Sequence, residues 1–398
     1  LCMGRLSDAY GHKRFFNIGF IIFTLGMGLA AASQTIVELI SCRVLMAVGA
    51  AMVLTSNVAL VTEAFPAHER GRAMGVLTAV TSAGLAMGPL AGGVLLDSLG
   101  WRAVFYVRIP LGVAGVLLGV MFLRETSRAR FPGYDFWGAL TVVGGLVSIC
   151  IAANQAIAWG FGSLTFLGVV GAGSLLLLVF VVIEHRVDQP IFDLGMLRNP
   201  IYLSGIVSMA LYFVAGGTSY YLLPFFMIQG VGYSASLTGL LLAIFPLTMG
   251  LVSPLAGIAS DRIGSRTPAI FGVIFQAGSL VVMSLLGPDV LVFVMVLVMV
   301  CNGIGAGLYE APNISAIMGT ARKTQLGSVS ASLAVSRQVG LIAGIVVGGA
   351  LFSVRRDHYL DFNTGNVAVV GGFHDAVLWM IGVSALAGLV TWLRGRGN

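Results

Sequence analysis

Long apolar segments are the feature that constrains this chain most. An α-helix needs about 20 predominantly apolar residues to cross ~30 Å of hydrocarbon. Twelve stretches of this kind are predicted: Phe15–Ala32, Val37–Val61, Ala73–Leu96, Val104–Leu123, Phe136–Trp159, Leu164–Ile183, Ile201–Ile228, Leu237–Ile258, Ala269–Leu286, Val290–Ile317, Ala331–Val354 and Ala376–Leu393. The alternating polarity of transmembrane strands is absent from the sequence. The sequence therefore predicts an all-α membrane protein with about twelve complete transmembrane helices.

The charge distribution predicts the orientation of these helices. Only 10% of the 398 residues are charged and 58% are hydrophobic, whereas soluble domains are about 25% charged. With the segment before Phe15 in the cytoplasm, most of the 22 basic residues lie on that side. The opposite side keeps Arg102, Arg108, Arg355 and Arg356, and the predicted spans hold Arg43 and Arg337. This bias follows the positive-inside rule. It accounts for the net charge of +6 without a nucleic-acid partner.

Residues for covalent or metal chemistry do not cluster. No Ser-His-Asp, HExxH or paired-carboxylate pattern occurs in the sequence. The four cysteines Cys2, Cys42, Cys150 and Cys301 lie far apart, which is typical of reduced packing residues. The glycines of Gly303-x-Gly305-x-Gly307 fall within a predicted membrane helix, so a phosphate loop is not expected. The sequence therefore favours neither an enzyme nor a metal or cofactor site.

An internal repeat divides the chain. The segment that begins Gly4-Arg5-Leu6-Ser7-Asp8 and ends with Gly11, Lys13 and Arg14 is echoed 253 residues later by Gly257, Asp261, Gly264 and Arg266. Both copies lie on the predicted cytoplasmic side. Repetition on the same side indicates two halves related about the membrane normal. Because residues 1–8 are too short to span, we expect the chain to begin at the end of a helix, as an N-terminally truncated sequence.

Two motifs resemble those of the major facilitator superfamily. The pattern Gly4-x-Leu6-x-Asp8-x-x-Gly11-x-Lys13-Arg14 resembles the loop after the second helix of that family. The pattern GxxxGPxxGG resembles its antiporter motif and is matched by Gly84, Gly88, Pro89, Gly92 and Gly93. Eight predicted helices instead of six separate the two copies of the repeat, which is similar to the fourteen-span drug:proton antiporter branch.

The resemblance implies an architecture and a function. It implies a major facilitator fold of two pseudo-symmetric bundles: residues 1–123 lacking the first helix and most of the second, residues 124–200 with two inserted helices, and residues 201–398 with six helices. It also implies a bacterial plasma-membrane protein, monomeric, that exports small organic compounds, often lipophilic cations, by alternating access. Protons would drive export without a cofactor. A narrow exporter of an antibiotic, siderophore or amino acid is the alternative.

The repeated loops are predicted to act as a conformational switch. Glycines at both ends of each loop permit a tight turn between close helices. A carboxylate is stabilised at the positive N-terminus of a helix. We therefore expect Asp8 to meet the helix that begins near Ser328–Ala331, and Asp261 to meet the helix start near Ala73. The alternative is that the loops only mark orientation. The switch residues are Gly4, Asp8, Gly11, Lys13, Arg14, Gly257, Asp261, Gly264 and Arg266.

Two charged residues inside spans are predicted to take part in proton coupling. Arg43 lies within a predicted span, where an unpaired charge is costly, so it should have a partner. It resembles the arginine of the family's RxxQGxGAA motif, although Met46 and Ala47 replace the glutamine and first glycine. Glu310 is the best-placed carboxyl for loading a proton in a cavity. The alternative for Glu310 is a cap at the cytoplasmic end of a helix that Pro312 breaks.

Aromatic residues suggest a substrate cavity. Cation–π contacts would suit lipophilic cations, whereas an interfacial or lipid-facing aromatic belt is the alternative. The candidate cavity residues are Tyr212, Tyr220, Tyr221, Phe225, Tyr309 and Arg337. For Arg337, which begins an Arg-Gln-x-Gly segment, structural pairing within the C-terminal half is the favoured role. The antiporter glycines are expected to let helices approach closely, with a bend at Pro89.

Overall fold

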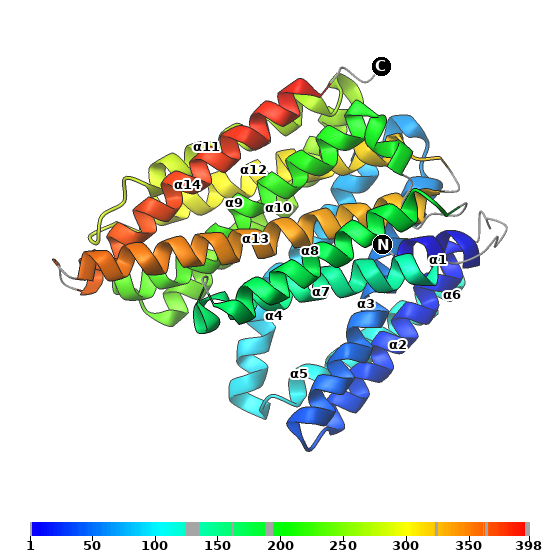
Figure 1. Ribbon diagram of the computed structural model, residues 1–398, viewed down its shortest axis with the longest axis horizontal. Coiled ribbons are helices and arrows are strands. Elements are labelled where there is room, and N and C mark those ends of the chain that lie inside the picture. Colours follow the sequence, from blue (N-terminus) through cyan, green and yellow to red (C-terminus); the bar gives the residue numbers. More distant parts are fainter. Residues whose placement is uncertain are drawn as a thin grey trace.

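The chain folds into membrane-length helices (Figure 1). The computed structural model describes residues 2–124, 135–160, 163–187, 194–322, 325–360, 362 and 365–394, and these contain no strand. The helices are α1 Cys2–Tyr10, α2 His12–Ala32, α3 Ile36–Ala64, η1 Ala67–Glu69, α4 Arg70–Leu99, α5 Ala103–Tyr106, α6 Arg108–Phe122, α7 Phe136–Trp159, α8 Leu164–Glu184, η2 Leu194–Arg198, α9 Pro200–Phe225, η3 Phe226–Gly230, α10 Ala235–Ile263, α11 Arg266–Met283, α12 Val292–Gly319, α13 Leu326–Leu360 and α14 Gly365–Leu393.

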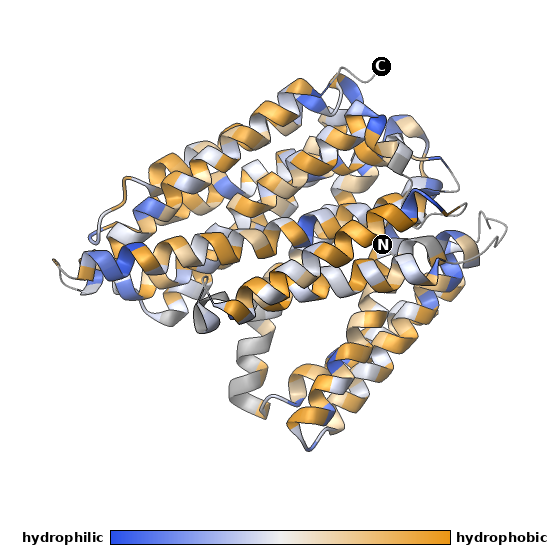
Figure 2. Cartoon of the chain, in the orientation of Figure 1, coloured by the Kyte–Doolittle hydropathy of each residue, from blue (hydrophilic) through white to orange (hydrophobic). Residues whose placement is uncertain are grey.

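The all-α membrane fold is confirmed. Every predicted apolar stretch lies on a helix, and the stretch Val104–Leu123 is divided between α5 and α6. Ten helical segments of the described part are long and apolar enough to cross a membrane, and α7 adds the shorter apolar stretch Phe136–Ala152. Figure 2 shows hydrophobic residues along the lengths of the helices, with hydrophilic residues gathered toward their ends. This distribution suits a hydrocarbon surround between two polar layers.

Local sequence sets the helix ends. Thr35 and Glu38 form a capping box at the start of α3, and Asn199 caps α9. Gly11, with φ 94°, separates α1 from α2. Gly264, with φ 84°, separates α10 from α11 at the matched position of the repeat. Only glycine adopts this conformation without strain, so both turns form as the sequence predicted.

Similar glycine contacts join helices in both halves. Gly19 on α2 lies against the backbone of Gly49 on α3, and Gly272 on α11 lies against Gly305 on α12. The repeat offset of 253 residues takes Gly19 to Gly272, whereas Gly49 would correspond to Asn302 and the observed contact is with Gly305. Small residues at such contacts let two backbones approach, which is how helices associate in lipid. Between the halves in sequence, α7 and α8 pack on each other, and α7 also touches α13.

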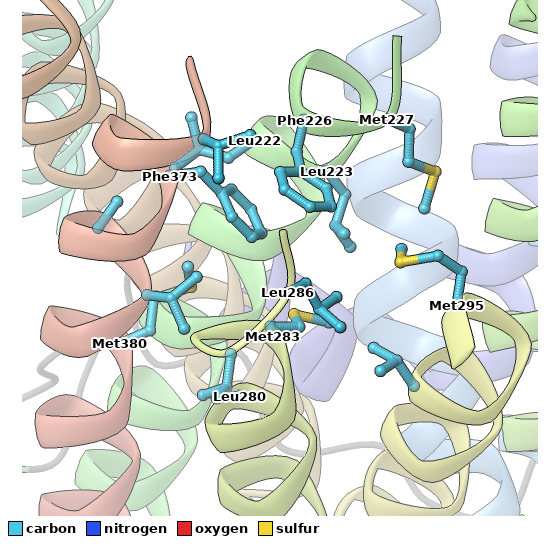
Figure 3. Packing of buried hydrophobic residues seen from close by; sticks show 14 of the residues in the cluster. Leu222, Leu223, Phe226, Met227, Leu280, Met283, Leu286, Met295, Phe373 and Met380 are labelled. Atoms are coloured by element: carbon cyan, nitrogen blue, oxygen red, sulfur yellow. The ribbon is translucent and has the colours of Figure 1, made fainter. Parts of the chain in front are cut away.

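The largest apolar core lies within the C-terminal half (Figure 3). Phe226 on η3 stacks on Phe373 of α14 with ring centroids 4.3 Å apart. Met227, Met283 and Met295 belong to the same buried cluster. The corresponding cluster in the N-terminal half is smaller and centres on Met27, Ala30, Ala31, Met46 and Phe105. Among the described residues, the larger buried apolar cluster therefore lies in the C-terminal half.

One alternative and one expectation about the helices are wrong. Helix α12 continues through Pro312 to Gly319, so Glu310 does not cap a helix that ends there. A proline removes one helical hydrogen bond, which packed neighbours in a membrane bundle can compensate. The expected close approach at Gly84 and Gly88 is also absent, because open space surrounds both positions on α4. Helix α4 is unbroken at Pro89.

Several predicted positions fall outside the described part. The surroundings of Pro89, Gly92 and Gly93 are among these, as are the basic residues Arg128, Arg130, Lys323 and Arg396 that were assigned to the cytoplasmic side.

Candidate functional site

Asp8 joins the N-terminal half to the start of α13. It lies near the end of α1 and is 5% exposed. The backbone N–H of Gly327 donates to its Oδ1 at 2.6 Å, and the N–H of Ser328 donates to its Oδ2 at 3.0 Å. These amides belong to the first turn of α13, where N–H groups lack helical acceptors and the helix dipole favours an anion. The predicted contact of Asp8 is therefore present.

Asp261 makes the matching contact in the other direction. It lies near the end of α10, in the C-terminal half, and faces the start of α4. The N–H of Gly71 donates to its Oδ1 at 2.7 Å, and the N–H of Arg72 donates to its Oδ2 at 2.8 Å. This contact, too, was expected from the repeat. We call the Asp8 and Asp261 contacts the N-latch and the C-latch.

Glycines bring the paired helices close enough for these bonds. A methyl group added at Gly4 would overlap the carbonyl oxygen of Gly327, and one added at Gly257 would overlap that of Gly71. Each of these glycines precedes its aspartate by four residues, one helical turn, so both lie on the same face of the helix. The glycine sets the distance between the two helices, and the aspartate then reaches the N-terminal amides of the facing helix.

The two latches connect the halves reciprocally. α1 of the N-terminal half contacts α13, and α10 of the C-terminal half contacts α4. Since α10 and α12 end, and α13 begins, at the same side of the bundle, both latches lie at one face of the molecule, toward the right in Figure 1. That face carries the loops predicted to be cytoplasmic. The latches hold its two halves together.

The other switch residues support the loop ends. Lys13 Nζ donates to the carbonyl of Val120 on α6 at 2.9 Å. The guanidinium of Arg266 lies 5.6 Å from the ring centre of Trp392 on α14. Arg14 is exposed. These contacts tie Lys13 and Arg266 to their own halves, whereas Gly4, Asp8, Gly257 and Asp261 contact the other half.

A buried cluster beside the N-latch was not predicted from the sequence. His12 Nε2 lies 3.7 Å from Asp8 Oδ1 and 3.6 Å from Glu63 Oε1 on α3. Its Nδ1 is 2.8 Å from Ser7 Oγ, which lies 3.0 Å from Ser56 Oγ. His12 occupies a variable position of the loop motif, and Glu63 lies more than fifty positions away in the sequence. Only the spacing of His12 one turn after Asp8 could have indicated a contact.

Glu310 and Arg337 form an ion pair inside the C-terminal half. Glu310 on α12 is 5% exposed and pairs with Arg337 on α13. The guanidinium of Arg337 also lies 5.1 Å from the ring centre of Phe213 on α9. Both charged residues were predicted separately from the sequence, and the favoured pairing of Arg337 within its own half is present. The tertiary structure brings them together.

Arg43 has an aromatic partner. Its guanidinium lies 4.9 Å from the ring centre of Phe105 on α5, on an exposed face of α3. A cation over an aromatic face is stabilised electrostatically. Arg43 is thus not brought to the Glu310–Arg337 pair, and its role in proton coupling stays a prediction.

The aromatic candidates do not converge on one cavity in this conformation. Tyr212 and Tyr309 are 4% and 0% exposed and stack with ring centroids 4.1 Å apart, inside the packed C-terminal half. Tyr220 is 58% exposed. Tyr221 and Phe225 pack together against the large apolar core. Tyr212 and Tyr309 therefore act as core residues here, and a substrate role for the others stays a prediction.

A membrane protein of this design is a secondary transporter: all-helical, internally duplicated, and closed at one face by reciprocal contacts between its halves. In the part of the chain that the structure describes, no group of three or more His, Cys, Asp or Glu side chains could hold a metal ion. The profile of the Major Facilitator Superfamily matches residues 1–345 and, separately, residues 205–396. The chain belongs to this family of cell-membrane transporters, which are not enzymes.

A solved structure shares the fold. The human organic anion transporter MFSD10 superposes with a TM-score of 0.68 at 18% sequence identity, over 98% of this chain and 79% of that chain. At this identity the likeness concerns the fold alone.

Curated relatives include several bacterial transporters. The riboflavin transporter RibZ of Clostridioides difficile is 30% identical over 93% of this chain and 80% of its own length. The multidrug resistance protein Stp of Mycobacterium tuberculosis is 30% identical over 87% of this chain, which spans only 65% of Stp. The puromycin resistance protein of Streptomyces alboniger is 28% identical over 98% of this chain and 79% of its own length.

Proposed function

We propose that this protein exports drug-like organic compounds across the cell membrane in exchange for protons. The observation that carries the proposal is the ion pair of the buried Glu310 carboxylate with Arg337, whose side chain is 34% exposed. An ionisable pair within a transmembrane bundle is costly to maintain and is typical of ion and proton pathways. Support comes from the relatives named for multidrug and puromycin resistance and from the antiporter motif between Gly84 and Gly93.

Making and breaking the two latches would close and open one face of the protein during transport. With Asp8 and Asp261 bonded to α13 and α4, the cytoplasmic face is closed. Breaking both contacts would let the halves rock apart and expose the interior to the cytoplasm, as alternating access requires. Export then needs substrate to bind from the cytoplasm, the latches to re-form, and a proton to enter from outside.

Glu310 is proposed to couple the proton to this cycle. When Glu310 is ionised it neutralises Arg337, and α12 is held to α13. A proton on Glu310 removes that attraction and leaves Arg337 over the ring of Phe213. Because α13 also carries the amides that Asp8 binds, a shift of α13 would act on the N-latch. Proton binding and closure of the cytoplasmic face are linked in this way.

The test uses inside-out proteoliposomes with an acidic interior and a fluorescent pH probe. If the protein exchanges compound for protons, ethidium or puromycin added outside should raise the interior pH, because protons leave as the compound enters. Glu310→Gln should abolish this response. Asp357→Asn, a matched change at an exposed carboxylate whose side chain is 63% exposed, should preserve it. Compound uptake without proton movement, or an unchanged response in Glu310→Gln, would overturn the proposal.

A single-substrate transporter is the second candidate. The observation that favours it is the resemblance to RibZ, which covers more of this chain than the resemblance to Stp. The same vesicles distinguish the two candidates when riboflavin, puromycin and ethidium are compared. A response to riboflavin alone would favour the narrow transporter, and a response to chemically unrelated compounds would favour the broad one.

A further inference from the structure

Arg394, directly after the end of α14, is a buried cation with unused hydrogen-bond donors. The residue is 2% exposed. Its Nη2 donates to Oδ1 of Asn313 on α12. Its Nε and Nη1 are buried and have no hydrogen-bond partner among the described residues. Buried charges in proteins are normally paired and buried N–H groups are normally bonded, so the guanidinium lacks an acceptor in this conformation.

No carboxylate in the described part of the chain compensates this charge. None of the ion pairs found there includes Arg394. Glu310, three residues before Asn313 on α12, is already paired with Arg337. The side chain of Asn313 is also fixed, since its Nδ2 donates to the carbonyl of Gly205 on α9 at 3.2 Å. The two remaining donor groups of Arg394 are therefore available to a ligand that brings its own negative charge.

We infer that Arg394 is the binding site of a phosphate group, which reaches it from the cytoplasmic side when the latches are open. A guanidinium suits phosphate oxygens because it is planar, always charged and rich in N–H donors. The guanidinium of Arg266, in the loop that follows the C-latch, lies 5.6 Å from the ring centre of Trp392 on α14. The end of α14 therefore lies at the latch face, toward the right in Figure 1.

Ile317 on α12 covers the site in the closed form. A methyl group added at Gly205 would lie 2.5 Å from Cγ1 of Ile317 and 2.7 Å from Nη2 of Arg394, so both side chains pack over this glycine. Ile317 is 0% exposed and belongs to a buried apolar cluster that includes Ala59 of α3 and Met74 of α4. These two residues come from the N-terminal half. The cover of Arg394 is therefore part of the apolar seam between the halves.

The effect of a bound phosphate follows from linkage. When the latches break and the halves separate, the apolar cluster divides, and solutes from that side gain access to Arg394 past Ile317. A phosphate group that binds only the open form multiplies the opening equilibrium by 1 + [phosphate]/Kd. Binding would thus favour opening toward the cytoplasm, whatever compound the protein transports.

Amide hydrogen exchange at the latches tests this inference. The full chain, freed of lipid, is studied at pH 7 in dodecyl maltoside, a detergent without phosphate. Sodium phosphate then replaces sodium chloride at constant ionic strength. Protection of the latch amides should fall about tenfold once phosphate reaches about nine times its Kd. Both latches should respond together, at Gly327 and Ser328 for the N-latch and at Gly71 and Arg72 for the C-latch.

A second arm distinguishes the two sources of the phosphate group. Here phosphatidylglycerol is added to the micelles and the buffer contains no inorganic phosphate. A response to inorganic phosphate alone would identify a free anion as the ligand, and a response to the lipid alone would identify a headgroup. Absence of a response in both arms would overturn the inference.

Three variants make the test specific. Arg394→Gln removes the charge and should abolish the response, whereas Arg394→Lys keeps a charge and should retain it at weaker affinity. Arg124→Gln, at an exposed arginine just after the end of α6, is the matched control and should respond like the unmodified protein. Protection without added phosphate shows that each variant is folded.

Two outcomes with these variants would contradict a site at Arg394. One is a response that persists in Arg394→Gln, and the other is a response lost equally in Arg124→Gln. None of these readouts requires transport, so failure of the proposed function would be seen separately.

Discussion

Asp8 and Gly327 lie 319 positions apart in the sequence and are joined by a hydrogen bond of 2.6 Å across the two halves of the transporter. The bond links a carboxylate to the first turn of a helix, where charge and unsatisfied amides attract it together. Asp261 and Gly71 repeat the relationship from the opposite half. The face predicted to be cytoplasmic is thus held closed by two similar contacts, one from each copy of the repeat.

Removing the charge of one latch should loosen this face. Asp8→Asn keeps the shape of the side chain but loses the attraction to the α13 N-terminus, which is worth up to ~2 kcal/mol when partly buried. Opening should become up to about 30-fold more frequent. The labelling rate of Ser330→Cys, at a buried position of α13, by a charged maleimide in a background without the native cysteines would measure it. Asp289→Asn, in the exposed loop before α12, is the control, and equal rates in both variants would contradict the role of Asp8.

A methyl group between the latch helices should prevent their close approach. Gly257→Ala places it against the carbonyl of Gly71, and such overpacking typically costs about 1–3 kcal/mol. The closed form should be destabilised, with faster labelling of a cysteine near the C-latch and a lower thermal midpoint in detergent. Gly84→Ala is the matched change in open space and should be neutral. A Gly84→Ala variant as damaged as Gly257→Ala would refute the packing described for α4.

Breaking the ion pair of the buried Glu310 carboxylate should cost more than breaking a pair whose carboxylate is exposed. Arg337→Gln leaves Glu310 buried and unpaired, for which about 3–5 kcal/mol is typical. The double variant Arg337→Gln with Glu310→Gln should recover part of that loss. Thermal unfolding in detergent measures the coupling energy as a double-mutant cycle. The exposed pair Arg356–Asp357 is the reference and should couple by at most about 1 kcal/mol; equal coupling in the two cycles would argue against burial of the Glu310 carboxylate.

The stacked tyrosines should respond differently to loss of their hydroxyl groups. The Tyr309 hydroxyl lies 2.8 Å from Ser208 Oγ, so Tyr309→Phe should destabilise the fold by about 1 kcal/mol. The Tyr212 hydroxyl is buried and has no hydrogen-bond partner among the described residues. Tyr212→Phe should be neutral or stabilising. Thermal midpoints of the two variants provide the comparison, and a reversed order would show that the hydroxyl of Tyr212 is satisfied by another group.

Local pattern was sufficient for the helices and the latches. Apolar length predicts the spans because every backbone amide in lipid must be satisfied within its own helix. The repeat predicts that Asp8 and Asp261 make matching contacts. Each carboxylate follows a packing glycine by one helical turn, so it lies on the face where that glycine lets a second helix approach. The spans and the Gly–Asp spacing of the latches depend on residues close together in the chain, whereas the latch contacts join residues 319 and 190 positions apart.

Proline and glycine patterns were less informative. Pro312 indicated a broken helix, yet the surrounding helices keep α12 continuous. The glycines at positions 84 and 88 indicated a close helix contact, but nothing in the structure approaches them. A glycine permits a close helix contact and a proline permits a kink. The neighbouring helices then determine whether the contact or the kink forms.

By itself the sequence determined the all-helical membrane fold, its repeated loops and the residues of the two reciprocal latches. Apolar length and the spacing within each motif are local properties of the chain. Only the tertiary structure decided that Glu310 meets Arg337, that Tyr212 stacks on Tyr309, and that His12 lies between Asp8 and Glu63. These contacts join residues on different helices, and their formation depends on how the helices rotate and pack, which no local pattern specifies.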